Sequence, residues 1–95
     1  MDLTGKQVLV AGLGKSGIAA GALLKKMGCM VCLFDGNEKF DRGAWEKTYP
    51  VFSDCPLWIG ELPDAAVQEM ELAVVSPGIP LDTPAILKLQ AAGVP

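Results

Sequence analysis

The hydrophobic residues of this chain follow two patterns that alternate along the sequence. Continuous apolar runs, which predict strands, lie at 7–11, 30–35, 57–60 and 72–76. Stretches with helical spacing of their apolar residues, or with the signals of a helix start, lie at 15–27, 44–48, 63–70 and 84–92. Continuous rather than alternating apolarity is typical of parallel strands that are covered on both faces. The alternation of strands and helices therefore predicts a parallel α/β sheet.

A glycine motif connects the first predicted strand to the first predicted helix. Gly12, Gly14 and Gly17 are spaced as Gly-x-Gly-x-x-Gly. In such a turn the first glycine permits a tight reversal, the second admits a phosphate close to the backbone, and the third lets the helix pack on the strand. The amides from Gly14 to Gly17 are then free donors at the positive end of a helix, which is a candidate anion site.

The motif and the alternation together predict a Rossmann-like doubly wound parallel sheet in the order 3-2-1-4. A chain of 95 residues forms one domain, residues 1–95. We interpret Val94-Pro95 as the first step of a fifth strand that is truncated. Ligands of such sheets bind outside the carboxyl ends of the strands, at the switch point between the first and fourth strands.

Two further features are expected at that edge of the sheet. Asp35 ends the second strand, and a rigid Ser76-Pro77-Gly78 turn follows the fourth. Together with the glycine turn they predict a nucleotide diphosphate as ligand. An acid about 20 residues after such a turn often binds a ribose hydroxyl of NAD, which keeps a dehydrogenase module open as an alternative. The plainer interpretation of Asp35 is an acid that caps a loop.

Local signals place the helices more closely. The apolar side of the first helix is predicted to consist of Ile18, Ala19, Ala22, Leu23 and Met27. Pro63 suits the first turn of the third helix, and Thr83 is expected to cap the last helix with Pro84 in its first position.

Composition excludes several function classes. The net charge is −3, so no basic surface is expected to attract nucleic acid. No apolar run approaches the length of about 18 residues that a membrane span needs, and the start lacks the zones of a signal peptide, so we expect a cytoplasmic protein with no membrane contact. The chain has no histidine, which removes the commonest general base and metal ligand.

The cysteines are predicted to be buried core thiols. Their number is three, Cys29, Cys32 and Cys55, which argues against a disulfide framework. Cys29 and Cys32 are spaced as Cys-x-x-Cys, but positions three apart in a strand point to opposite faces. We therefore predict neither a metal site nor a redox pair.

Nearly the whole chain resembles the amino-terminal domain of the Mur ligases, which build peptidoglycan precursors in the bacterial cytoplasm. The segments that carry the resemblance are Gly5-Lys6-Gln7-Val8, Gly12-Leu13-Gly14-Lys15-Ser16-Gly17, Phe34-Asp35 and Val75-Ser76-Pro77-Gly78-Ile79-Pro80. Within the family the chain is most similar to the ligases that add D-glutamate to UDP-N-acetylmuramoyl-L-alanine. The resemblance implies that this domain binds the UDP part of that substrate.

Site residues follow from the resemblance position by position. It implies that the backbone of Gly14, Lys15, Ser16 and Gly17 holds the diphosphate, and that Gly78 approaches it from the opposite side. Asp35 would accept a hydrogen bond from the uracil ring, and Gly36 would offer a backbone contact. Asn37 stands where relatives often place a basic residue over the uracil.

The chain departs from the whole family in lacking Gly-x-x-x-x-Gly-Lys-Ser/Thr, the loop that cradles ATP phosphates. The sites for ATP, Mg²⁺ and D-glutamate are therefore expected beyond Pro95. The chain is interpreted as a monomeric fragment of a three-domain ligase that binds substrate, holds no cofactor and has no catalytic residue of its own. Besides the dehydrogenase module, a non-enzymatic nucleotide-sensing domain is the remaining alternative.

Overall fold

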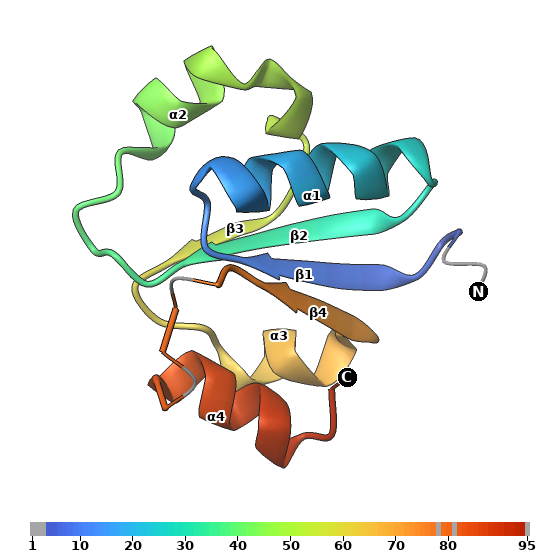
Figure 1. The fold of residues 1–95 in the computed structure, drawn as a ribbon, viewed down its shortest axis with the longest axis vertical. Coiled ribbons are helices and arrows are strands. Elements are labelled where there is room, and N and C mark those ends of the chain that lie inside the picture. Colours follow the sequence, from blue (N-terminus) through green and yellow to red (C-terminus); the bar gives the residue numbers. More distant parts are fainter. Residues whose placement is uncertain (1–3, 78, 81, 95) are drawn as a thin grey trace.

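The computed structural model describes residues 4–77, 79–80 and 82–94. Their strands form one parallel sheet in the order β3-β2-β1-β4, as the sequence predicts (Figure 1). The strands are β1 (Gln7–Ala11), β2 (Met30–Asp35), β3 (Leu57–Ile59) and β4 (Leu72–Val75). Because all of them run in the same direction, their carboxyl ends meet at one edge of the sheet.

Helices cover both faces of the sheet, which confirms the doubly wound arrangement (Figure 1). The helices are α1 (Lys15–Lys26), α2 (Arg42–Thr48), the 3-10 helix η1 (Pro50–Phe52), α3 (Asp64–Glu69) and α4 (Pro84–Ala91). One face is covered by α1, α2 and η1, and the other by α3 and α4.

The sheet separates two apolar clusters, and β1 contributes to both of them. Val8 and Val10 pack in the cluster beneath α1, whereas Leu9 and Ala11 pack in the cluster beneath α3 and α4. All four side chains are 0% exposed. This burial on both faces is the physical reason for the continuous apolar run in the sequence.

The predicted apolar face of α1 is correct only in part, because Ile18 and Ala22 pack against the cluster beneath the helix whereas Ala19, Leu23 and Met27 are exposed. Leu23 and Met27 are 59% and 41% exposed, while the buried residues of the helix are Gly17, Gly21 and Leu24. A Cβ atom added at Gly21 would lie 3.0 Å from a ring carbon of Phe52. The helix therefore packs through small residues that allow a close approach, and hydrophobic spacing does not detect such a face.

Two helix starts differ from their predictions. Pro63 precedes α3 as its N-cap residue instead of lying in the first turn. Thr83 does occupy the N-cap position of α4, but its hydroxyl donates to the carbonyl oxygen of Pro80 at 3.1 Å and caps no helix amide. The side chain of Thr83 therefore stabilises the preceding turn.

Helix α2 begins two residues before its predicted start, and Asp41 caps it by accepting a hydrogen bond from the amide of Ala44 at 3.1 Å. Trp45 then packs against the rings of Phe40, Tyr49 and Phe52 at centroid distances of 5.3–5.8 Å. This aromatic cluster anchors the long connection between β2 and β3 on the α1 side of the sheet.

The last described residue, Val94, lies on the α3 and α4 side of the sheet. Val94 belongs to no strand; its amide donates to the carbonyl oxygen of Leu89 at 3.0 Å and its side chain packs on the adjoining cluster. Pro95 lies outside the described residues, and the fifth strand stays a prediction.

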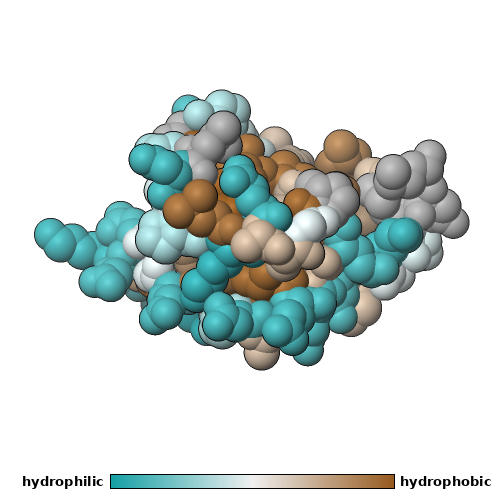
Figure 2. Space-filling view, turned by 90° about the horizontal axis from the view of Figure 1, so that it is seen from below, coloured by the Kyte–Doolittle hydropathy of each residue, from teal (hydrophilic) through white to brown (hydrophobic). Residues whose placement is uncertain are grey.

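The surface seen in Figure 2 is mostly hydrophilic, with hydrophobic residues gathered near the middle of the view. In the part of the chain that the structure describes, every helix is too short or too polar to cross a membrane.

The Gly17→Ala substitution tests the close approach of α1 to the glycine turn. A Cβ atom at Gly17 would lie 1.9 Å from the carbonyl oxygen of Gly12, whereas a Cβ at Gly14 would meet nothing within 4 Å. We expect Gly17→Ala to lower the free energy of unfolding by about 1–3 kcal/mol or more, measured by urea denaturation. The matched Gly14→Ala variant should cost clearly less, at most about 1 kcal/mol, because alanine is a poorer N-cap residue than glycine but its Cβ atom meets nothing. Equal losses in the two variants would contradict this packing.

Candidate functional site

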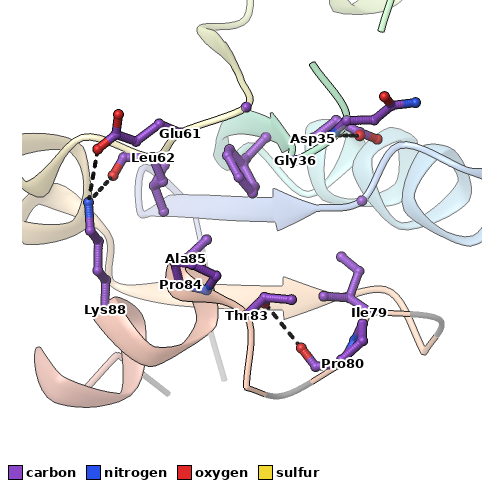
Figure 3. A pocket seen from close by; sticks show the side chains of 14 residues that line it. Asp35, Gly36, Glu61, Leu62, Ile79, Pro80, Thr83, Pro84, Ala85 and Lys88 are labelled. Carbon is purple, nitrogen blue, oxygen red and sulfur yellow. Dashed lines mark hydrogen bonds and ion pairs between the residues drawn. The ribbon is translucent and has the colours of Figure 1, made fainter. Parts of the chain in front are cut away.

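A pocket of about 590 Å³ opens at the carboxyl edge of the sheet. Its walls come from the glycine turn, from the segments that follow β2 and β3, and from the connection between β4 and α4 together with α4 itself (Figure 3). The lining residues are Gly12, Phe34, Asp35, Gly36, Asn37, Gly60, Glu61, Leu62, Ile79, Pro80, Thr83, Pro84, Ala85 and Lys88. This is the position at which open parallel sheets bind their ligands.

Gly12 is enclosed by the segments on both sides of it. Its φ angle of +92° lies in the region that favours glycine. An added Cβ would lie 2.8 Å from Ile79 Cδ1 and 2.8 Å from Ser76 Cβ. Its amide donates to the carbonyl oxygen of Phe34 at 2.8 Å. The glycine turn therefore meets the ends of β2 and β4, and the three predicted features come together.

Asp35 joins the glycine turn to the segment that follows β2. Its Oδ2 atom accepts a hydrogen bond from the amide of Leu13 at 3.1 Å, and its Oδ1 atom accepts one from the amide of Asn37 at 2.9 Å. The carboxylate is half-buried and lines the pocket (Figure 3). Each carboxylate oxygen can accept a second hydrogen bond. Asp35 thus holds the loop in place and retains acceptor capacity for a ligand.

The amino end of α1 has the properties of an anion site. Gly14 is its N-cap residue, and no side chain accepts a hydrogen bond from the first turn. Gly14, Lys15 and Ser16 are exposed, whereas Gly17 is buried against the turn. Uncapped amides at a helix start attract negative charge. These residues do not line the pocket itself.

The predicted contacts after β2 lie at the pocket. Gly36 and Asn37 are exposed and line it, with the ring of Phe34 below Gly36. The side-chain oxygen of Asn37 accepts a hydrogen bond from the amide of Lys39 at 3.0 Å, which directs its carboxamide oxygen into the loop. Gly78 lies outside the described residues, although the neighbouring Ile79 and Pro80 are part of the wall.

Sequence reasoning missed the contributions of β3 and α4 to this pocket. Gly60, Glu61 and Leu62 directly follow β3, and Lys88 reaches the pocket from the second turn of the last helix. The signal for the first group was available, because β3 belongs to the same parallel sheet and its carboxyl end must share the edge. The position of Lys88 depends on how α4 crosses the sheet, which the sequence does not specify.

The polar groups at this edge of the sheet can bind a ligand through hydrogen bonds. Free backbone amides at α1 suit phosphate oxygens, and the remaining acceptor capacity of Asp35 suits an N–H group of a base or a hydroxyl of a sugar. Within residues 4–77, 79–80 and 82–94, no three ligating side chains are grouped so that they could hold a metal ion.

The cysteines lie away from this pocket and are free thiols. Cys32 packs in the cluster beneath α3 and α4, whereas Cys29 packs against the cluster on the other face, as predicted for the Cys-x-x-Cys spacing. Burial raises the pKa of the thiols of Cys32 and Cys55. The ammonium group of Lys25, with Nζ 3.7 Å from Cys55 Sγ, opposes the increase in the pKa of Cys55.

Comparison with known proteins identifies the family. The family model described as Mur ligase MurD-like, N-terminal domain, matches residues 6–95. The chain belongs to the Mur ligases. The matched residues include all four strands and the glycine turn, and the match confirms the resemblance seen in the sequence.

Several bacterial ligases are similar in sequence to this chain over about a fifth of their own length. The UDP-N-acetylmuramoylalanine–D-glutamate ligase of Lachnospira eligens is 42% identical over 97 residues, which cover 100% of this chain and 21% of that enzyme. The enzyme of the same name from Caldicellulosiruptor saccharolyticus is 45% identical over 82 residues, or 85% of this chain and 18% of that enzyme. That of Clostridioides difficile is 38% identical over 94 residues. The chain thus spans about a fifth of the length of these ligases.

The Asp35→Asn substitution tests the structural role of the carboxylate. An amide side chain has one accepting oxygen, so its NH₂ group would face either the Leu13 or the Asn37 amide and leave that donor unpaired. We expect the free energy of unfolding to fall by about 1–3 kcal/mol. Asp41→Asn is the matched control, because Asp41 accepts from a single amide and asparagine caps helices equally well. Equal effects of the two variants would show that Asp35 does not need both oxygens.

Thiol modification tests the placement of the cysteines. At pH 8 we expect Cys29 to react with a thiol reagent before Cys32 and Cys55. The raised pKa values of the two buried thiols reduce their thiolate fractions at a given pH, and their burial limits access. Mass spectrometry of peptides after timed quenching measures the order. Simultaneous modification of all three thiols would contradict the burial of Cys32 and Cys55.

Proposed function

We propose that this Mur ligase domain binds the UDP moiety of UDP-N-acetylmuramoyl-L-alanine in the cytoplasm, for ATP-dependent addition of D-glutamate during peptidoglycan precursor synthesis. The observation that carries the proposal is the meeting of the glycine turn, Asp35 and the connection after β4 around one pocket, in a chain of this family. The same edge of the fold suits both parts of a nucleoside diphosphate, because it offers free amides next to a mostly apolar pocket.

Each part of the UDP group has its own region of the site in this proposal. The diphosphate binds the backbone amides of Gly14, Lys15, Ser16 and Gly17, at the uncapped start of α1. The uracil and ribose enter the pocket, where Asp35 accepts a hydrogen bond from the base and Gly36 and Asn37 contact it. Gly78 approaches the diphosphate from the opposite side.

The role of the domain is to anchor the substrate. Binding energy from the remote UDP group positions the reacting end of the molecule for chemistry elsewhere in the ligase. In this proposal ATP and Mg²⁺ bind in the part of a full-length ligase that this chain does not span, since the chain covers about a fifth of the length of its relatives and lacks the phosphate loop for ATP. We therefore expect the domain alone to bind its substrate as a monomer and to ligate nothing.

A titration of amide NMR shifts tests the proposal directly. Addition of UDP should shift the amides of residues 12–17, 35–37 and 76–78, because these segments surround the ligand. Addition of NAD at the same concentrations should leave them in place. If NAD shifts these amides and UDP does not, the domain binds dinucleotides and the proposed function is wrong.

The Gly14→Val variant separates the diphosphate site from the rest of the domain. A Cβ atom at Gly14 would meet nothing within 4 Å, so we expect the variant to fold, but the side chain would block the approach of a phosphate to the α1 amides. We therefore expect UDP binding to be lost while the spectrum remains that of a folded domain. Unchanged UDP affinity in this variant would remove the glycine turn from the site.

A further inference from the structure

Lys88 connects α4 to the segment that follows β3. Its Nζ atom donates to the carbonyl oxygen of Leu62 at 2.9 Å, and it forms ion pairs with Asp64 at 3.2 Å and Glu61 at 3.8 Å. Figure 3 shows this side chain reaching across from the helix, at the end of the pocket away from Asp35. Both Leu62 and Lys88 line the pocket, so the connection joins two of its walls.

The hydrogen bond to the carbonyl group is the important part of this connection. The side chains of Glu61 and Asp64 are 88% and 81% exposed, and ion pairs with such exposed partners contribute little. The Lys88 side chain is only 33% exposed, and Leu62 itself is 1% exposed in the core. A charged donor on a partly buried carbonyl oxygen is a stronger interaction than the two ion pairs.

The segment after β3 is thereby fixed at both of its ends. At one end the amide of Gly60 donates to the carbonyl oxygen of Asp35 at 2.8 Å, which continues the pairing of β3 with β2. At the other end the carbonyl oxygen of Leu62 is held by Lys88. The first contact is part of the sheet. At the second end the Leu62 side chain packs in the core, and the hydrogen bond to its carbonyl oxygen depends on Lys88.

We propose that Lys88 is a positioning residue for the nucleoside part of the ligand, an inference that rests on the proposed function. By holding residues 60–62 against α4, it sets the width of the pocket at the end opposite Asp35. Among the described residues no backbone hydrogen bond joins the start of α1 to this segment, and residues 14–17 do not line the pocket. Loss of Lys88 therefore weakens the binding of the base and ribose and leaves the binding of phosphate unchanged.

The test compares UDP with inorganic pyrophosphate on the Lys88→Met variant, which keeps the apolar stem of the side chain and removes its ammonium group. We expect the affinity for UDP to fall about fivefold to tenfold, and the affinity for pyrophosphate to stay within about twofold. Lys88→Arg should restore a large part of the UDP affinity. Equal losses for both ligands, or no loss for UDP, would overturn the proposal.

Lys25→Met is the matched control. Lys25 also pairs with an acid, Asp54, at 2.7 Å, but it lines a different pocket. Its removal should leave the affinity for UDP unchanged, and thermal unfolding of both variants shows whether a loss of stability accompanies the loss of binding. A fall in UDP affinity in Lys25→Met equal to that in Lys88→Met would mean that Lys88 acts only through general stability.

Hydrogen exchange separates a failure of this inference from a failure of the proposed function. In the absence of any ligand, the amides of residues 60–62 should exchange faster in Lys88→Met than in the unaltered chain, while those of β1 stay protected. Unchanged exchange would refute the positioning role even if UDP binds. If the unaltered chain does not bind UDP at all, the proposed function fails, and so does the role of Lys88 in nucleoside binding.

Discussion

The candidate site depends on glycine at position 17, which has no side chain. Helix α1 lies so close to the glycine turn that a single Cβ atom there would overlap the carbonyl oxygen of Gly12. This contact places the start of the helix directly at the carboxyl end of β1. The backbone of Gly12 is in turn bonded to the end of β2 and covered by Ile79. The location of the pocket and the direction of the free amides both follow from that one close approach.

Much of the fold could be predicted from the sequence, because burial on both faces leaves a clear signal. The continuous apolar run of β1 gives the position of a central strand, and the same pattern locates β2 and β4. Apolar spacing did not locate the whole packing face of α1, whereas the glycine motif predicted the close approach at Gly17, which the structure confirms. Gly17 lies against Gly12 and Gly21 lies against Phe52, and these contacts exist only in the folded chain.

The site was predicted in part, for a comparable reason. Motif spacing located the glycine turn and Asp35, but it offered a choice between a loop cap and a ligand contact for the carboxylate. The structure shows that the cap exists, since Asp35 accepts hydrogen bonds from Leu13 and Asn37. The two roles are compatible because a carboxylate has more acceptor sites than these amides use. The wall that Lys88 holds escaped prediction, because it joins a helix to a loop far away in sequence.

The central position of β1 also has a consequence for how the chain folds. Val8 pairs with Val31 on one side and with Leu72 on the other. The first strand in the sequence therefore has one of its two neighbours more than 60 residues further along the chain. Pairing between such distant segments costs loop-closure entropy before the contacts between the strands form. Such pairings therefore lower the folding rate. During synthesis β1, α1 and β2 are made before β4, so β1 at first has only β2 as a neighbouring strand. The pairing with β4 completes the hydrogen bonding of the central strand and brings the connection that follows β4 to the edge where the pocket lies.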